Sequence, residues 1–229
     1  MKLLTIDTST STCSVALTID QRLAGEYLLQ LDRTLTNRLL SCVDTLLSDA
    51  GIRTCDLDGF AVALGPGSFT GVRVGVATVK GLALAVDKPV VGFSSLAMLA
   101  GNLPWSSFPV CPMFDARKKE VYAGIYRCKE VPHPLAADCV LPPADFLKKI
   151  NGPAVFIGEG SEKYRDLITS SMGADAFFAP WNVHQPRASA GALLAADLFS
   201  KGKSVPLAEL NPIYIRPSEA ELAKLHRHP

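Results

Sequence analysis

The sequence predicts an α/β protein of two related lobes, each built on a mixed sheet with flanking helices. Apolar runs typical of strands alternate with segments of helical periodicity along the 229 residues, which is the pattern of a sheet covered by helices. The same pattern starts again after a turn-rich stretch at residues 101–109. We therefore place the N-terminal lobe at residues 1–103 and the C-terminal lobe at 104–229, and we expect a tail from about residue 208 to pack back on the first lobe.

In the N-terminal lobe, short apolar runs separated by turn residues predict strands. A helix fits residues 34–51, because apolar side chains recur every three or four positions and Gly51 suits a helix end. The run at 57–65 is almost wholly apolar, as in a strand buried on both faces of a parallel sheet. The other expected elements are strands at 2–9, 12–19, 22–31 and 88–95 and a short helix at 95–100.

In the C-terminal lobe, residues 110–128 predict a hairpin that turns at Arg117–Lys119. A proline-rich connector follows at 131–143, and an alanine-rich helix is expected at about 187–200. The elements expected between them are helices near 144–150 and 162–170 and strands at 153–160 and 176–180.

The composition indicates an ordinary globular protein and excludes several classes. Hydrophobic residues make up 48% and charged residues 20%, and the net charge is +1. A chain that gripped nucleic acid tightly by itself would show a basic excess, whereas the densest basic cluster, Arg117–Lys119, is better interpreted as a solvated loop. No signal peptide or membrane-spanning run is recognisable, and the six cysteines form no C-x-x-C pair. We therefore expect a cytoplasmic protein without a zinc site or a disulfide framework.

The stretch "LGPGSFTGVRVGVATVKGLALAV" at 64–86 is glycine-rich and leads into a helix. Such a turn often cradles a phosphate. It lacks the lysine and hydroxyl residue of a P-loop, because Gly71 is followed by Val72 and Arg73. It also misses the dinucleotide fingerprint, since its third glycine comes one residue late. The backbone N–H groups of Ser68–Thr70 remain a candidate anion site, but a tight turn is the favoured interpretation.

The helix that follows has more apolar surface than one sheet can cover. Between residues 72 and 86 the only charges are Arg73 and Lys80, which lie on one face. Small residues recur every fourth position, a spacing that permits close backbone approach. We infer that the surplus face packs against another protein. The small pairs are Gly71–Gly75, Ala77–Gly81 and Gly81–Ala85.

Candidate ligand residues follow the first expected strand. Asp7 is followed by Ser9 and Thr10 in a hydroxyl-rich turn, a shape that can surround a phosphate. The same residues favour an Asx or Ser/Thr turn on their own. They are weak cofactor-binding candidates, and the turn is preferred.

No self-sufficient active site is recognisable elsewhere. The histidines do not form an H-x-x-x-H pair, and the spacing indicates neither a metal site nor a Ser-His-Asp arrangement. Asp115 and Glu120 flank the basic cluster and could act as a carboxylate pair, but a hairpin with alternating charges explains them equally well. The histidines are His133, His184, His226 and His228.

Five blocks of the sequence resemble the bacterial TsaB (YeaZ) family. They occur in the family's order and span essentially the whole chain. The glycine block and the "DAR..EVY" pattern are the most specific. The blocks are "DTST…CSVAL", "ALGPGSFTGVRVGVATVKGLA", "FDARKKEVYAGIY", "FIGEGSEKY" and "NPIYIRPSEAE".

The resemblance implies an actin-like, ASKHA-type fold and a role in forming threonylcarbamoyladenosine on tRNA, at the adenosine next to the anticodon. A family member is the non-catalytic partner of the related TsaD, which holds the metal and performs the transfer, while TsaE is an ATPase that joins them. The chain is then expected to have no catalytic, metal or cofactor site of its own, to meet tRNA through the complex, and to leave ATP or ADP to the complex interface. An exposed apolar seam would also allow a homodimer in isolation.

The family pairing places TsaD against the first two helices of the N-terminal lobe. Carried onto this chain, the interface residues are Leu39, Val43, Leu46, Gly71, Gly75, Thr78 and Leu82. This chain departs from many relatives at Leu35-Thr36-Asn37, where they have His-Ser-Glu/Gln. The departure puts polar contacts at that helix start in doubt.

Two other functions stay open at this stage. An ASKHA-type small-molecule phosphotransferase is suggested by the fold and by Asp7, and it requires ATP binding by the isolated chain. A glycoprotease-like metallopeptidase is the least favoured, because the histidine pattern does not support it.

Overall fold

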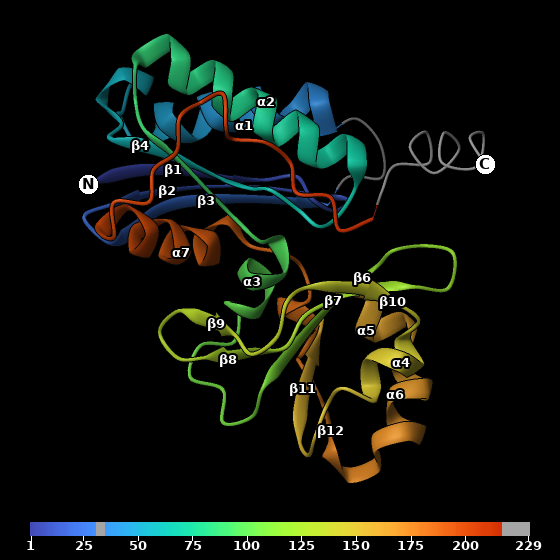
Figure 1. Cartoon of the computed structure of the whole chain (residues 1–229). Helices are drawn as coiled ribbons and strands as arrows, with labels where there is room; N and C mark the ends of the chain where they lie inside the picture. The colour runs from blue at the N-terminus through green and yellow to red at the C-terminus, as the bar shows by residue number, and fades with distance from the viewer. Residues whose placement is uncertain (31–34, 217–229) are drawn as a thin grey trace, which may run out of the picture.

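The computed structural model describes residues 1–30 and 35–216, without the side chains of residues 35–37. It has two lobes, each with its own sheet (Figure 1). The expectation of two sheets with flanking helices is confirmed.

The N-terminal sheet has the strand order β3-β2-β1-β4-β5. Strands β1, β2 and β3 are antiparallel to one another, whereas β4 runs parallel to β1 and β5 runs parallel to β4. Nearly every residue of the two central strands is buried, as expected for a sheet covered on both faces. The strands are β1 Lys2–Asp7, β2 Thr12–Ile19, β3 Arg22–Gln30, β4 Gly59–Ala63 and β5 Val90–Phe93.

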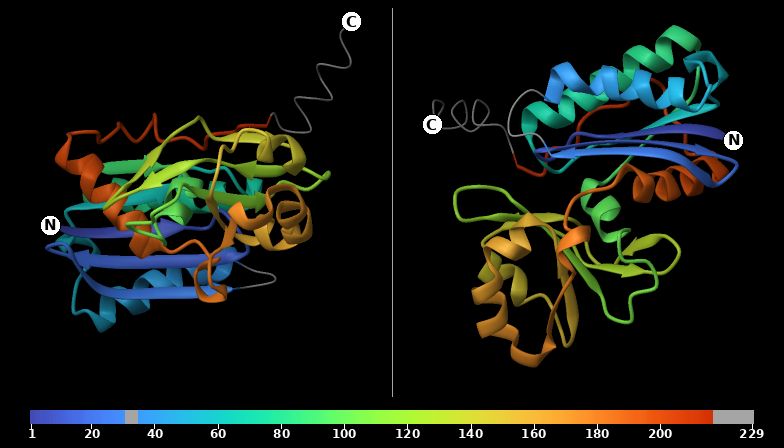
Figure 2. Two further views of the ribbon diagram at one scale, coloured as in Figure 1. Left: turned by 90° about the horizontal axis from the view of Figure 1, so that it is seen from below. Right: turned by 180° about the vertical axis from the view of Figure 1, so that it is seen from behind.

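Helices cover both faces of this sheet. Figure 2 shows from behind that α1 (Leu35–Asp49) and α2 (Phe69–Val86) lie on one face, while α7 (Ala188–Ser200) lies on the other. The cluster under α1 and α2 includes Leu4, Ile6 and Phe60. Between the lobes lies α3 (Ser95–Ala100), whose residues are all buried. A 3₁₀ turn, η1 (Thr54–Asp56), precedes β4.

The C-terminal sheet has the order β10-β7-β6-β11-β12, with β8 pairing to β6 and β9. Its strands are β6 Val110–Asp115, β7 Val121–Ala123, β8 Tyr126–Cys128, β9 Pro132–Pro134, β10 Cys139–Leu141, β11 Ala154–Ile157 and β12 Ala176–Phe178. The remaining helices are α4 Pro143–Leu147, α5 Glu159–Lys163, α6 Arg165–Met172, and the 3₁₀ turns η2 Gly173–Asp175 and η3 Trp181–Val183.

Two local expectations for this lobe need correction. The connector at 131–143 contains β9 and β10 and is not a plain loop. The strand expected at 153–160 ends at Ile157, because Gly158 adopts a positive φ of 100° and turns the chain into α5. The N–H of Gly158 donates to Nδ1 of the buried His184 at 2.9 Å, which fixes this turn.

Helix α7 packs on the N-terminal sheet, where it contacts β1 and β2 most extensively. Its first N–H groups need acceptors: the N–H of Ala188 donates to Ser14 Oγ at 2.8 Å and that of Ser189 to Glu26 Oε1 at 2.9 Å. The assignment of residues 104–229 to the C-terminal lobe is therefore corrected, because the chain returns to the first lobe at α7, before residue 208.

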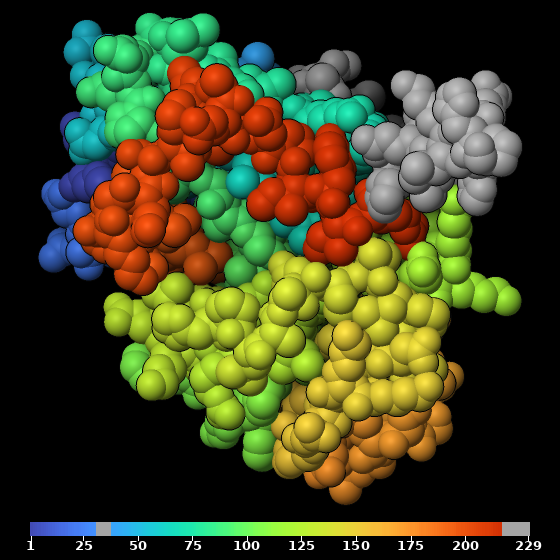
Figure 3. Space-filling model, in the orientation of Figure 1, coloured from blue at the N-terminus to red at the C-terminus, as the bar shows by residue number. Residues whose placement is uncertain are grey.

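A strap formed by residues 205–216 continues this return (Figure 3, red). Val205 bridges to Val90 at the edge of the N-terminal sheet, and the N–H of Ile213 donates to the Leu64 carbonyl oxygen at 2.8 Å. At its end Arg216 reaches the C-terminal lobe, where it donates to the Ala116 carbonyl oxygen at 2.8 Å and pairs with Glu120. The strap thus links both lobes.

Replacing the first glycine of α2 tests its tight packing. A Cβ at Gly71 would lie less than 3.0 Å from the Thr8 carbonyl oxygen, whereas a Cβ at Gly81 meets no atom within 4 Å. We expect Gly71→Ala to lower the free energy of unfolding by about 1–3 kcal/mol, because backbone must move. Gly81→Ala should raise it by about 0.5–1 kcal/mol through helix propensity. Urea unfolding of both variants measures this difference, and equal effects would contradict it.

Candidate functional site

The glycine loop packs backbone against backbone on the β1–β2 turn. The N–H of Ser68 donates to the Ser9 carbonyl oxygen at 2.6 Å, and the Thr8 hydroxyl donates to the Gly71 carbonyl oxygen at 2.7 Å. A Cβ at Gly67 would lie less than 3.0 Å from that same Ser9 oxygen. The glycines here permit a close approach within the chain, as the tight-turn interpretation predicts.

This packing also occupies part of the candidate anion site. The N–H of Ser68 is bonded to Ser9, and the N–H of Gly71 donates to Ser68 Oγ at 3.2 Å as the helix N-cap. The groups that would cradle a phosphate at 68–70 are thus partly used to close the loop.

Asp7, Ser9 and Thr10 are brought together by the β1–β2 turn, but all three are buried. Asp7 Oδ1 accepts the N–H of Ser9 at 3.1 Å, and Thr10 Oγ1 accepts the N–H of Thr12 at 3.1 Å. These are the local turn bonds that such residues favour. The geometry explains the side chains of Asp7 and Thr10 as turn formers, while Ser9 takes part through its backbone N–H, and cofactor binding by the three residues stays a prediction.

The Asp7 carboxyl has an unusual environment. Its Oδ2 atom is buried and has no hydrogen-bond partner among the described residues. Burial raises the pKa of Asp7 to about 7, because a charged carboxylate without sufficient partners is poorly solvated in the interior.

The seven residues assigned to the partner interface do not form a surface. Leu39, Val43 and Leu46 are at most 4% exposed and belong to the core between α1 and the sheet. Gly71 and Gly75 are also buried. The last two, Thr78 and Leu82, are only partly exposed. These seven residues are therefore corrected as the proposed contacts with a partner. That a partner binds to α1 and α2 stays a prediction.

The physical reason lies in the neighbours of the small residues. A Cβ at Gly75 would lie 2.5 Å from Thr8 Oγ1, so this glycine lets α2 approach β1 of the same lobe. The spacing Gly71–Gly75 therefore serves an internal contact, and a helix from another protein cannot use it. In contrast, Gly81 faces open space.

The outer face of α1 and α2 includes Ala77, Gly81 and Ala85, which the small-residue spacing had indicated, and two leucines that the sequence did not single out. Leu84 on α2 is 73% exposed and Leu40 on α1 is 56% exposed. Beside Leu84 lie Ala77, Gly81 and Ala85, all exposed. We call these five residues the outer face. The sequence signal that could have identified the outer face is the spacing of the larger apolar residues on the opposite side of α2, which are buried in the structure: Val72, Val76, Val79 and Ala83.

Helix α2 is unusually apolar for a helix that has one side exposed to solvent. Among the helices of the described residues it alone is long and apolar enough to cross a membrane by length and composition, yet only 33% of it is buried within the chain. That test is weak evidence for a membrane span, because helices of globular domains also pass it. Since α2 packs on β4 through its valines, its outer face is the part that lacks a covering element.

The polar residues considered for catalysis are used in structural contacts. His184 accepts from Gly158 through Nδ1, and its Nε2 lies 3.0 Å from the Ala179 carbonyl oxygen. Asp115 pairs with Lys163 at 2.7 Å, and Glu120 pairs with Arg216. Within residues 1–30 and 35–216 no three His, Cys, Asp or Glu side chains are grouped so as to hold a metal. The departure from the relatives at Leu35-Thr36-Asn37 concerns side chains that the structure does not describe.

Replacing the buried carboxyl tests its environment. Because the pKa of Asp7 is raised from 3.8 to about 7, its contribution to stability is fully present below about pH 4 and is lost as pH rises to about 7. Asp7→Asn keeps the shape without the charge. Relative to the variant, the wild type should lose up to about 4 kcal/mol of unfolding free energy between pH 4 and 8.

Urea unfolding across this pH range measures the difference. Asp44→Asn, which removes an exposed carboxylate of α1, is the matched control for the loss of one charge. Parallel curves for the wild type and Asp7→Asn would contradict the assignment.

The matching family model and the named relatives of this chain both concern threonylcarbamoyladenosine on tRNA. The model of the TsaD family, described as tRNA N6-adenosine threonylcarbamoyltransferase, matches residues 30–224. A protein of Bacillus subtilis named tRNA threonylcarbamoyladenosine biosynthesis protein TsaB is 34% identical over 232 residues, 96% of each chain. Its namesake in Escherichia coli is 33% identical, over 94% of this chain and 95% of its own.

Solved structures agree with the sequence relatives. YeaZ from Pseudomonas aeruginosa matches with a TM-score of 0.81 at 31% identity, over 93% of this chain and 99% of the other. A ROK hexokinase from Thermus thermophilus, at 12% identity and a TM-score of 0.52 over 88% of this chain and 100% of its own, shares the fold alone. The chain therefore has the actin-like (ASKHA) fold, and it belongs to the TsaB (YeaZ) family of tRNA threonylcarbamoyladenosine biosynthesis proteins.

Proposed function

We propose that this chain is a non-catalytic subunit in threonylcarbamoyladenosine formation on tRNA. It binds and orders the catalytic TsaD subunit, which transfers the threonylcarbamoyl group to the adenosine next to the anticodon. The observation that carries the proposal is the outer face of α1 and α2, an apolar surface on two adjacent helices that nothing in the described chain covers. The names of the relatives support the reaction.

The shape of the outer face suits a helical partner. Ala77, Gly81 and Ala85 follow one another at intervals of four residues along the exposed side of α2, so a second helix can approach its backbone closely. Leu84 and Leu40 stand beside this stripe as large apolar side chains. Exposed apolar groups on a small-residue surface are the composition of a helix–helix seam.

The contacts of the polar residues considered for catalysis favour a non-catalytic role. The buried histidine has both ring nitrogens in contact with backbone groups, and the carboxylates Asp115 and Glu120 are paired with cations. The proposal therefore assigns metal binding and transfer to TsaD, leaves ATP or ADP to the complex interface, and includes TsaE as the ATPase that joins the complex. In the absence of TsaD, the same outer face would pair two copies of this chain in a homodimer.

A bulky residue at Gly81 tests the proposed interface without disturbing the fold. Because a Cβ at Gly81 meets no atom within 4 Å, Gly81→Leu adds volume only toward a partner. We expect it to weaken association with TsaD by more than about tenfold, which corresponds to roughly 1.4 kcal/mol of overpacking. Modification of a tRNA transcript by the reconstituted proteins should fall in parallel. Calorimetry measures the association with TsaD, and a reconstituted transfer assay measures the modification.

The control is Thr169→Leu, which adds a similar side chain at an exposed position of α6 on the other lobe. It should leave both association and modification unchanged. Wild-type association by Gly81→Leu, with its fold intact by circular dichroism, would refute this interface. Modification that proceeds equally well without this chain would refute the proposed function itself.

A further inference from the structure

The junction between the lobes carries an exposed aromatic and basic surface that the proposed interface does not use. On α2, the guanidinium carbon of Arg73 lies 3.6 Å from the centre of the Phe69 ring, and its Nε donates to the Tyr214 hydroxyl at 2.7 Å. The two rings lie 4.8 Å apart. Phe69 is 39% exposed and Tyr214 is 42% exposed, so each ring still presents surface to solvent.

A loop on the second lobe, which the strap links to the lobe junction, carries exposed cations. Residues Arg117, Lys118 and Lys119, at the tip of the β6–β7 hairpin, all have positive φ and are all exposed. The turn is closed by hydrogen bonds between Ala116 and Glu120 and from the Glu120 N–H to the Arg117 carbonyl oxygen. Three consecutive left-handed residues are unusual for side chains of this size, and this conformation places three cations on one short loop.

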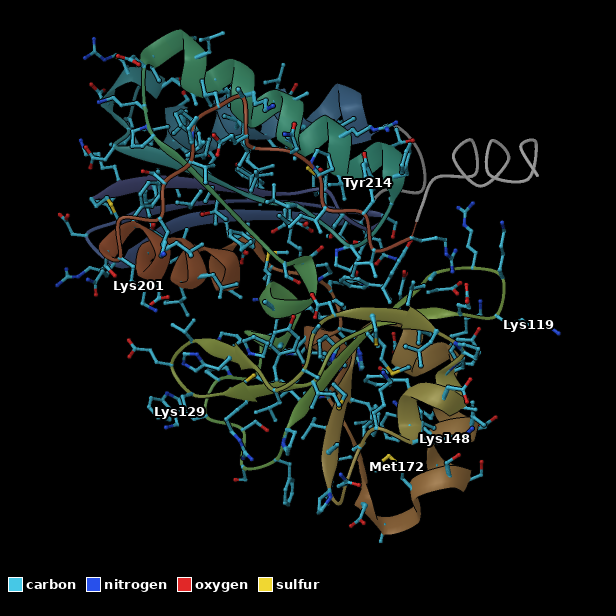
Figure 4. All side chains as sticks on the ribbon, viewed as in Figure 1. Lys119, Lys129, Lys148, Met172, Lys201 and Tyr214 are labelled. Carbon is cyan, nitrogen blue, oxygen red and sulfur yellow. The ribbon has the colours of Figure 1, made fainter. Side chains whose placement is uncertain are left out.

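The strap holds the two groups together. Arg216 bonds to Ala116 and Glu120 at the base of the hairpin, and Tyr214 is only two residues earlier in the chain. Two residues span at most roughly 7 Å along the backbone, so the strap brings Tyr214, on the ring side, and Arg216, on the hairpin side, to the same lobe junction. Figure 4 shows Tyr214 beside α2 on the N-terminal lobe and Lys119 at the outer tip of the hairpin, with Lys129 on the other side of the second lobe.

Among the described residues, the acidic groups around the hairpin do not pair with Arg117 or Lys119. Asp115 is paired with Lys163, and Glu120 is paired with Arg216. Burial and the nearby Asp115 raise the pKa of Glu159. Within the described residues, Arg117 and Lys119 form no ion pair, and their charges face solvent.

We propose that Phe69, Arg73, Tyr214, Arg117 and Lys119 form a contact surface for an RNA strand with unpaired bases. The cations bind phosphate groups, and an exposed ring accepts a stacked base, which is how proteins hold single-stranded nucleic acid. This inference rests on the proposed function, since the RNA in question is the tRNA held by the complex. With a net charge of +1, the chain supplies a few contacts to an RNA that the partner also holds.

Removing the two hairpin charges tests the phosphate contacts. The probe is a fluorescent tRNA transcript, and the protein is the complex of the full chain with TsaD, followed by anisotropy at several salt concentrations. We expect Arg117→Gln/Lys119→Gln to weaken binding about tenfold, and to lower the slope of log affinity against log salt by about 1–2. The matched control is Lys129→Gln/Lys203→Gln, which removes two exposed lysines elsewhere on the surface and should retain wild-type affinity.

The ring is tested separately through Tyr214. Tyr214→Phe retains the aromatic face, whereas Tyr214→Leu retains only apolar bulk. We expect the leucine variant to bind the transcript about fivefold or more weakly, and the phenylalanine variant to stay near wild type.

The outcomes separate this inference from the proposed function. If the wild-type complex binds and modifies tRNA while both hairpin substitutions leave affinity and salt slope unchanged, the RNA surface is refuted and the function stands. Equal losses in the hairpin variant and its control would also refute it, because only total charge would matter. A hairpin variant that no longer assembles with TsaD in size-exclusion chromatography would show a protein contact instead. A wild-type complex that neither binds nor modifies tRNA would refute both proposals.

Discussion

The backbone contact between the glycine loop and the β1–β2 turn determines the geometry of the N-terminal lobe. Ser68 and Gly71 bond to Ser9 and Thr8, and the absent side chains at Gly71 and Gly75 allow this approach. Backbone groups are rigid compared with side chains, so the contact sets the position of α2 along and above the sheet. Any larger residue at either glycine would lift the helix away from β1.

The fixed position of α2 also determines what it presents to solvent. With Val72, Val76 and Val79 held in the core, the helical period turns Ala77, Gly81 and Leu84 outward. The proposed partner surface therefore depends on the same contact as the core, although it shares no residues with it. A substitution on the outer face can change association without disturbing the packing of the core, whereas one at Gly75 changes both.

Much of the fold could be predicted because periodicity and turn residues are local signals. They placed α1, α2 and the strands of the first lobe close to their observed bounds. The sequence could not show which neighbour a small residue faces, so Gly71 and Gly75 were assigned to a partner helix when they face Thr8. It also could not show which sheet α7 covers, since that choice depends on Ser14 and Glu26, which lie far away in the chain and accept its first N–H groups.

The glycine loop also connects the two proposed surfaces. The Ile213 N–H bonds to the Leu64 carbonyl oxygen at the start of the loop, and the strap then carries Tyr214 to Arg73 and Arg216 to the second lobe. The N-terminal end of α2 is thus fixed from below by β1 and from its side by the strap. A partner bound on the outer face would rest on the C-terminal half of α2, whereas an RNA bound at the lobe junction would rest on its N-terminal end, so the two proposed surfaces share one helix without sharing residues.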